Sequence, residues 1–177
     1  MPFSGRINVR IIGIDPGTGI LGFGVIDALA DGKVKLIDGG VIRTKVNQPL
    51  DERLVEIYRH LASVISKTRP VVMAVEKLFF AQNVTTAISV SHARGVAILS
   101  GKIAGLEIFE YTPLQIKQSL TGYGRADKKQ VQEMVRVLLG LSEIPKPDDC
   151  ADALATAICH ANSAPHQPAS RRSRKLR

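Results

Sequence analysis

The sequence predicts an α/β fold in which three antiparallel strands come first and helices alternate with two further strands afterwards. Two observations predict it. Between residues 10 and 42 the apolar residues fall in three short runs with short connections, as expected of strands that pair antiparallel. From Leu50 onward, apolar residues recur at three- and four-residue spacing, which is the period of a helix. The predicted order of elements is β-β-β-α-β-α-β-α-α-α.

The three antiparallel strands are predicted over residues 10–14 (RIIGI), 22–29 (GFGVIDAL) and 34–42 (VKLIDGGVI). Asp31 and Gly32 mark the turn between the second and the third strand. The paired glycines inside the third run indicate a bulge or a close approach of another element.

The rest of the chain predicts five helices and two strands. Apolar residues from Leu50 onward form one helical stripe, and Pro70 ends that helix. Residues 71–76 (VVMAVE) are almost continuously apolar, as expected of a strand buried on both faces. The remaining elements are a helix over 84–104, a strand over 106–111, a short helix over 112–120, a helix capped by Asp127 and a helix over 147–161.

The composition indicates one globular domain. A chain of 177 residues with 45% hydrophobic and 23% charged residues can bury a core without a disulfide or metal staple. No apolar run reaches the roughly 20 residues that span a bilayer, and the N-terminus lacks a signal-peptide pattern. We therefore expect no membrane partner and a cytoplasmic protein, in which Cys150 and Cys159 are free thiols.

Positive charge is concentrated at the C-terminal end. The formal net charge is +8, and the last seven residues, RRSRKLR, carry five positive charges and no negative one. We expect a folded domain over 1–162 and a disordered basic tail over 163–177. The sign of the charge favours a polyanionic partner, above all nucleic acid.

A glycine-rich stretch follows the first strand and matches the pattern G-x-G-x-x-G at Gly17, Gly19 and Gly22. In a dinucleotide-binding fold the third glycine opens a helix. Here β-forming residues and a turn follow instead, so we expect a tight β-hairpin turn, and Asp38 is a strand residue rather than a ribose ligand. Actin- and sugar-kinase-like proteins have a similar first hairpin, but they enclose a nucleotide with two such domains, and this chain is too short for that.

Carboxylates stand at the ends of predicted elements. Asp15 ends the first strand and Glu76 ends the strand over 71–76, so the two emerge at one sheet edge if these strands are parallel neighbours. Asp149 and Asp152 lie three residues apart, on one face of the last helix. Carboxylates this close repel each other, and a divalent cation relieves the repulsion. Oxygen-only ligands suit Mg²⁺ or Mn²⁺, and no Cys/His spacing suggests zinc.

Each carboxylate taken singly also has a structural explanation. Asp15 precedes Pro-Gly and fits the start of a turn. The acidic residues over 148–152 fit the negative charges that stabilise a helix N-terminus, and we assign Asp148 to that capping role. The joint pattern of strand ends and a helix start favours a site.

Five segments of the chain together resemble the RuvC Holliday-junction resolvases of the RNase H-like (retroviral-integrase-like) superfamily. They are IGIDPGTGILGFGVI, MAVEKLFFAQN, SHARGVAILS, YTPLQIKQSLTGYGRADKKQVQ and DDCADALATAICH, in this order from about residue 10 to 160. The resemblance implies a mixed five-stranded sheet, three antiparallel strands then two parallel ones, with helices on both faces. It also implies a homodimer that binds four-way junction DNA in recombination and repair, nicks two strands of like polarity symmetrically, and works with the RuvA–RuvB branch-migration complex.

The resemblance also implies a catalytic metal site. Asp15, Glu76, Asp149 and Asp152 would hold two Mg²⁺ ions per active site, with Mn²⁺ as a substitute. The chemistry is two-metal phosphodiester hydrolysis that gives 5′-phosphate and 3′-hydroxyl ends. Lys128 is expected to act in catalysis by stabilising charge on the transition state.

The resemblance further implies three DNA-binding residues. Lys117 and Lys128 match lysines near the scissile phosphate, and Phe79 matches an aromatic residue that stacks on an unpaired base. For the lysines, an ordinary solvated surface charge is the competing explanation. Two positions depart from the family: Gly19 replaces a basic residue of many relatives, and Phe23 replaces a tyrosine. The resemblance therefore does not imply a DNA contact for the side chains at these two positions.

Two other functions fit part of the pattern. The same fold and basic tail would suit a non-catalytic junction-binding module, although the complete set of four carboxylates argues against it. The first hairpin would suit a nucleotide-binding protein of the actin- and sugar-kinase-like superfamily. Nicking of a four-way junction with Mg²⁺ excludes the first, and absence of stabilisation by ATP excludes the second.

Overall fold

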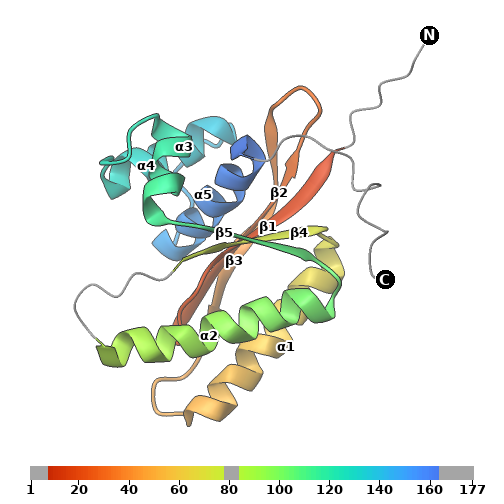
Figure 1. Ribbon diagram of the computed structural model, residues 1–177, viewed down its shortest axis with the longest axis vertical. Coiled ribbons are helices and arrows are strands. Elements are labelled where there is room, and N and C mark those ends of the chain that lie inside the picture. The colour runs from red at the N-terminus through yellow and green to blue at the C-terminus, as the bar shows by residue number, and fades with distance from the viewer. Residues whose placement is uncertain (1–7, 78–83, 164–177) are drawn as a thin grey trace, which may run out of the picture.

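The computed structural model of the chain describes residues 8–77 and 84–163. One five-stranded sheet with the strand order β3-β2-β1-β4-β5 lies between two layers of helices. Helices α1 and α2 cover one face, and α3, α4 and α5 cover the other (Figure 1). β1 pairs antiparallel with β2 and parallel with β4, β2 pairs antiparallel with β3, and β4 pairs parallel with β5. The predicted mixed sheet, with three antiparallel and then two parallel strands, is confirmed.

The antiparallel part consists of β1 (Val9–Asp15), β2 (Ile20–Ala28) and β3 (Val34–Arg43). Gly32 takes a positive φ of 87° in the turn between β2 and β3, which a glycine adopts without strain. The register of β3 against β2 shifts by one residue next to the paired glycines of β3. The predicted turn and the predicted bulge are therefore both present.

The remaining elements follow in the predicted order, and their ends differ from the predicted ends by one or two residues. They are α1 (Leu50–Thr68), β4 (Val72–Glu76), α2 (Val84–Ile103), β5 (Glu107–Tyr111), α3 (Pro113–Thr121), α4 (Lys128–Leu138) and α5 (Asp148–Ser163). Thr112 and Asp127 begin α3 and α4 with complete capping boxes, because each side chain accepts from the N3 backbone and the N3 glutamine accepts in return.

Helix α5 packs with its backbone close to the sheet because glycines of β1 and β2 face it. A Cβ atom at Gly13 would overlap the carbonyl oxygen of Ala153, and one at Gly22 would overlap the carbonyl oxygen of Asp149. Gly22 therefore lies inside β2 as a packing position and not in the hairpin turn. This agrees with the predicted strand over 22–29, which begins at Gly22.

The hydrophobic core is divided by the sheet into two halves. Alternate residues of β1 face opposite layers: Ile11 packs with α5, and Ile12 packs with α1 and α2. Cys150 and Cys159 are buried free thiols of α5. In the described part of the chain no helix is long and apolar enough to cross a membrane. The predicted basic tail lies outside the described residues.

Candidate active site

The ends of β1 and β4 bring Asp15 and Glu76 together. The two strands are parallel, and the last paired residues are Ile14 and Val75, so the next residue on each strand is the carboxylate. Gly13, two residues before Asp15, faces α5. Because side chains alternate along a strand, Asp15 points toward the same layer. The strands thus present both carboxylates at one edge, under the N-terminus of α5.

Helix α5 supplies the other two carboxylates. Asp149 lies in the first turn of α5, where its backbone packs directly over Gly22 of β2. Asp152 follows three residues later, and its side chain is 28% exposed. The close approach that Gly22 permits places this end of α5 over the sheet edge, as the sequence predicted.

The electrostatics show that the four carboxylates face each other. Burial and, after it, the nearby charges of Glu76, Asp152 and Asp149 together raise the pKa of Asp15 to about 7. Burial followed by the charge of Asp152 also raises the pKa of Glu76. Burial raises the pKa of Asp152 as well. Carboxyl groups whose pKa values are all raised indicate a site with more negative charge than its own protein cations neutralise.

Lys128 is the cation at the centre of this site. It is the first residue of α4, directly after the Asp127 cap, and its Nζ lies 3.1 Å from Asp152 Oδ2 and 3.2 Å from Asp148 Oδ2. Burial lowers the pKa of Lys128, but the hydrogen bonds and charges of Asp152 and Asp148 together outweigh burial, and the net pKa is raised. Asp148, which we assigned to helix capping, begins α5 and pairs with Lys128.

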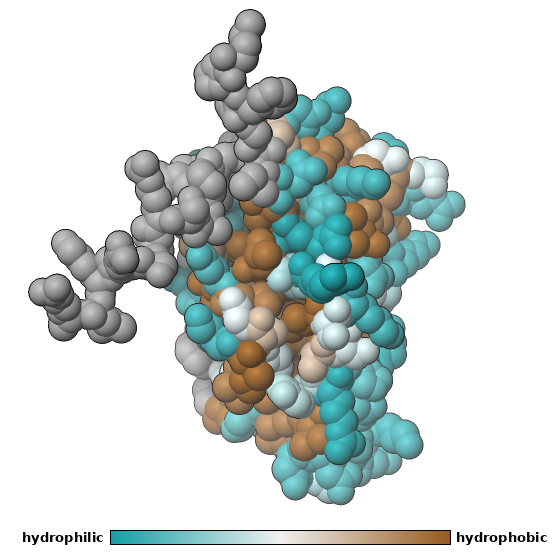
Figure 2. All heavy atoms as spheres, turned by 90° about the vertical axis from the view of Figure 1, so that its right-hand side faces the viewer, coloured by the Kyte–Doolittle hydropathy of each residue, from teal (hydrophilic) through white to brown (hydrophobic). Residues whose placement is uncertain are grey.

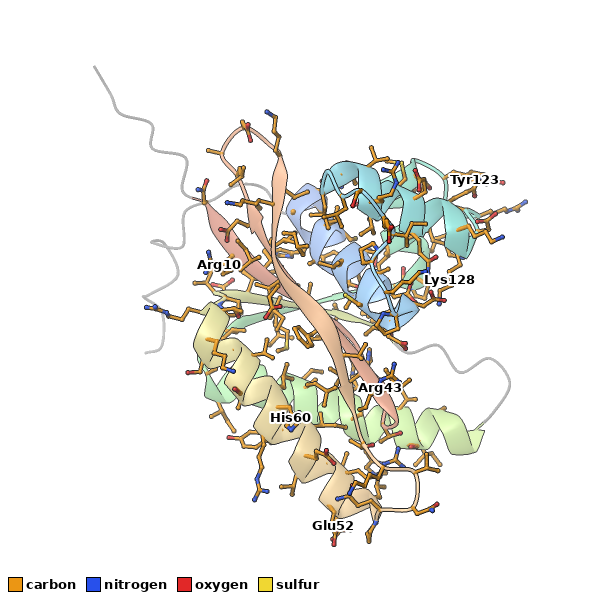
Figure 3. The ribbon with its side chains drawn as sticks, turned by 180° about the vertical axis from the view of Figure 1, so that it is seen from behind. Arg10, Arg43, Glu52, His60, Tyr123 and Lys128 are labelled. Atoms are coloured by element: carbon orange, nitrogen blue, oxygen red, sulfur yellow. The ribbon has the colours of Figure 1, made fainter. Side chains whose placement is uncertain are left out.

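Of the two other predicted DNA-binding residues, only Lys117 lies in the described part of the chain. Lys117 lies in α3, and its charge lowers the pKa of Glu76, so it faces the same site. Phe79 lies outside the described residues. Figure 3 shows Lys128 and Arg43 toward one end of the sheet, with Arg10 near the other end.

The donor set suits a hard divalent cation, because it contains carboxylate oxygens and no cysteine or histidine. The uncompensated negative charge that raises the pKa of Asp15 also fits a cation. As the side chains stand, no three His, Cys, Asp or Glu residues in the described ranges are arranged to hold a metal ion. The ion pair between Lys128 and Asp152 competes for one of the candidate ligands.

A polar network beside the site was not predicted from the sequence. Thr18, Thr44 and Ser89 come from three separate segments and are linked by hydrogen bonds, and Arg53 of α1 joins them. Threonines and serines in these segments carry no spacing that distinguishes them from other surface residues. The glycine at position 19 was the only signal nearby.

The mixed five-stranded sheet between two helical layers is an RNase H-like fold, and its carboxylates lie at the ends of two adjacent parallel strands, covered by a helix that adds two more. The family model described as "Crossover junction endodeoxyribonuclease RuvC" matches residues 11–160. The chain therefore belongs to the RuvC family of crossover junction endodeoxyribonucleases.

Individual relatives agree with this assignment. The chain is 55% identical to RuvC of Alkaliphilus metalliredigens over 153 residues, which is 86% of this chain and 93% of that protein. It is 52% identical to RuvC of Chloroflexus aurantiacus over 157 residues, 89% of this chain and 95% of that protein.

Solved structures are similar in fold. The structure of Thermus thermophilus RuvC matches with a TM-score of 0.82 and 39% identity, over 87% of this chain and 94% of that one. The same protein in complex with a Holliday junction substrate matches with a TM-score of 0.80. The yeast mitochondrial Holliday junction resolvase Ydc2 shares the fold alone, with a TM-score of 0.64 and 15% identity.

Proposed function

We propose that the protein resolves four-way DNA junctions by nicking two strands of like polarity symmetrically. The observation that carries the proposal is the convergence of Asp15, Glu76, Asp149 and Asp152 around Lys128, in a chain of the RuvC family. Family membership supports a nuclease that acts in recombination and repair. It gives no support to a non-catalytic module or to a nucleotide-binding protein.

The four carboxylates would hold two divalent cations, Mg²⁺ with Mn²⁺ as a substitute. When bound, such ions supply an activated water and Lewis-acid stabilisation of the leaving oxygen, which gives 5′-phosphate and 3′-hydroxyl ends. The carboxylates of Asp15 and Glu76 are partly buried, so water screens their mutual repulsion poorly. A bound divalent cation would relieve this repulsion.

Lys128 and Lys117 act on the phosphate. Lys128 Nζ is within reach of the carboxylates, and its side chain is 54% exposed at the start of α4. An ammonium group in this position favours the extra negative charge that develops on the phosphorus oxygens in the transition state. Lys117 adds positive charge on the α3 side of Glu76. We further propose that Phe79 stacks on an unpaired base of the junction.

A homodimer would use the outer face of α2. Ile88, Leu99 and Ile103 are all more than half exposed, and their spacing places them on one side of the helix. Gly95 lies on the same side, and a Cβ atom there would meet nothing within 4 Å. A flat apolar helix face of this kind is typical of a helix-to-helix interface. A monomeric mass in analytical ultracentrifugation at micromolar concentration would contradict the dimer.

The surface also carries apolar residues outside α2. Figure 2 shows hydrophobic residues in several separate areas among hydrophilic ones on the side at the right of Figure 1. Val71, the residue before β4, is 56% exposed. Because scattered apolar residues are normal at a protein surface, we attach no partner to them.

The proposal also includes the domain organisation of the chain, its localisation and its protein partners. The nuclease domain extends over 1–162 and the basic tail over 163–177, where five cations in the last seven residues would strengthen non-specific DNA binding. A chain shortened to 162 residues that binds junctions equally well at every salt concentration would contradict this role. We place the enzyme in the cytoplasm with the DNA, where the RuvA–RuvB complex is its expected partner, and co-purification of the three proteins on a junction tests that partnership.

The deciding experiment is Asp15→Asn. The substitution keeps the size of the side chain and removes its charge, so we expect the cleavage rate of a synthetic four-way junction to fall below detection in Mg²⁺ or Mn²⁺. Junction binding, measured by gel shift, should survive. Asp31→Asn, in the exposed turn far from the site, is the matched control and should cleave normally. Strand-resolved products that persist in Asp15→Asn would refute the site.

A further inference from the structure

The tip of the β1–β2 hairpin extends past the catalytic carboxylates toward the end of β3. Asp15 pairs with Gly22, and the ladder of β2 with β3 continues beyond that pair to Ile20 opposite Arg43. The backbone N–H of Thr44 then donates to the carbonyl of Gly19 at 3.1 Å. The hairpin tip is thus held in a fixed position about 10 Å along the strand from the Asp15 pair.

Buried hydroxyl groups orient the side chain of Arg53 at this tip by hydrogen bonds. The Thr44 hydroxyl donates to the carbonyl of Thr18 at 2.6 Å, and Arg53 Nε donates to Thr44 Oγ1 at 2.8 Å. Thr44 is 8% exposed and Thr18 is 7% exposed, and the Thr18 hydroxyl also bonds with Ser89 of α2. The guanidinium of Arg53 is therefore oriented by a network that joins three elements to the hairpin.

Among the described residues, no carboxylate forms an ion pair with the guanidinium of Arg53. Gly19 leaves the space in front of Arg53 open, because a Cβ atom at Gly19 would have Arg53 Nη2 as its nearest neighbour, at 3.6 Å. An arginine without an ion-pair partner in the described part of the chain therefore faces an open space at the hairpin tip.

We propose that Arg53, oriented by Thr44, binds a backbone phosphate of the DNA that is not the scissile one. The proposal rests on the proposed function, since it needs junction DNA in the site. A guanidinium fixed through Nε keeps its Nη donors for a phosphate, and its planar fork matches two phosphate oxygens. The side chain missing at Gly19 is what allows the phosphate to reach the arginine.

The first test compares Arg53→Gln with Arg59→Gln, which removes an equal charge from an exposed position on another side of α1. Junction affinity is measured by fluorescence anisotropy from 50 to 300 mM salt in Ca²⁺. Arg53→Gln should weaken binding roughly ten- to a hundredfold, the worth of a charged hydrogen bond. It should also lower the slope of log K against log salt by roughly 0.9 for each protomer in contact. Arg59→Gln should change neither.

The second test leaves Arg53 and its hydrogen bond in place. Gly19→Glu puts a carboxylate in front of the guanidinium, and Gly19→Gln puts an uncharged group of the same size there. We expect Gly19→Glu to weaken junction binding at least tenfold more than Gly19→Gln, with equal melting temperatures. This comparison remains informative if Arg53→Gln fails to fold.

The outcomes separate the two proposals. A wild-type chain that fails to bind and cleave junctions refutes the proposed function. A wild-type chain that cleaves, with an unchanged salt slope in Arg53→Gln and equal affinities in the two Gly19 variants, refutes the phosphate site and leaves Arg53 as a purely structural link between α1 and β3.

Discussion

At the scale of single residues, Lys128 has two effects on the site. Its charge lowers the pKa of Asp15, Glu76 and Asp152, each of which burial raises. It also lies within reach of a phosphate at the carboxylates. The first effect favours the ionised form of the candidate metal ligands, and we expect the second to stabilise the transition state.

Lys128→Gln tests both effects at once. The cleavage rate at saturating junction should fall roughly 10²- to 10³-fold, the usual cost of losing one donor to a developing negative charge. The acid limb of the pH–rate profile should move to higher pH, because the carboxylates lose the cation that lowers their pKa values. Lys129→Gln, an exposed lysine one residue further, is the control. Equal and small losses in the two variants would mean that Lys128 is a surface charge only.

At the scale of elements, the site depends on how closely α5 approaches the sheet. Gly13 and Gly22 have no side chain where α5 crosses β1 and β2, and α5 is buried along most of its length. The same contact fixes Asp149 and Asp152 over the strand ends. Small residues here serve packing, and packing sets the geometry of the carboxylates.

Gly13→Ala should therefore destabilise the fold. Its Cβ would overlap the carbonyl of Ala153, so α5 or β1 must shift, and overpacking of this kind costs about 1–3 kcal/mol in free energy of unfolding. Urea denaturation measures the loss, and junction cleavage should fall with it because α5 moves. Gly19→Ala is the control, since its Cβ meets only an ordinary contact at 3.6 Å. Equal stability of the two variants would contradict the close-packing explanation.

At the scale of the whole molecule, stability and function oppose each other. The sheet edge concentrates carboxylates that repel, and the fold holds them together with one nearby lysine that pairs with Asp152. The pKa of Asp15 is 3.8 in its ordinary state and about 7 in the folded chain. Between these values the folded state binds more protons than the unfolded state, so the free energy of unfolding falls as the pH rises.

Asp15→Asn should therefore stabilise the protein in EDTA at pH 8. The gain should appear as a higher melting temperature, by roughly 2–4 °C for each kcal/mol, and should shrink toward pH 4, where the wild-type carboxyl is protonated when folded. Mg²⁺ should raise the melting temperature of the wild type more than that of the variant. Calorimetry at the two pH values, with and without Mg²⁺, measures these shifts. A gain that is equal at both pH values would contradict the charge explanation.

Much of the fold could be predicted because the residues that begin, end and pattern its helices and strands act over short stretches of sequence. The alternation of apolar residues, Pro70 after α1 and Asp127 before α4 each act within a few residues, and the structure has these elements. The carboxylates could be predicted because Asp15 and Glu76 interrupt apolar strands at their ends. The contact of Gly22 with α5 could not be predicted, because sequence spacing does not show which glycine faces a helix.

The sequence by itself determined the order of elements, the identity of the four carboxylates and the family, since each depends on residue types at short spacing. Only the tertiary structure decided which residues of distant segments contact each other. Lys128 pairs with Asp148 and Asp152 because two helices meet, and Arg53 reaches Gly19 because α1 begins beside the end of β3. Such contacts join residues far apart in the chain, and their distances follow from packing, which no local pattern encodes.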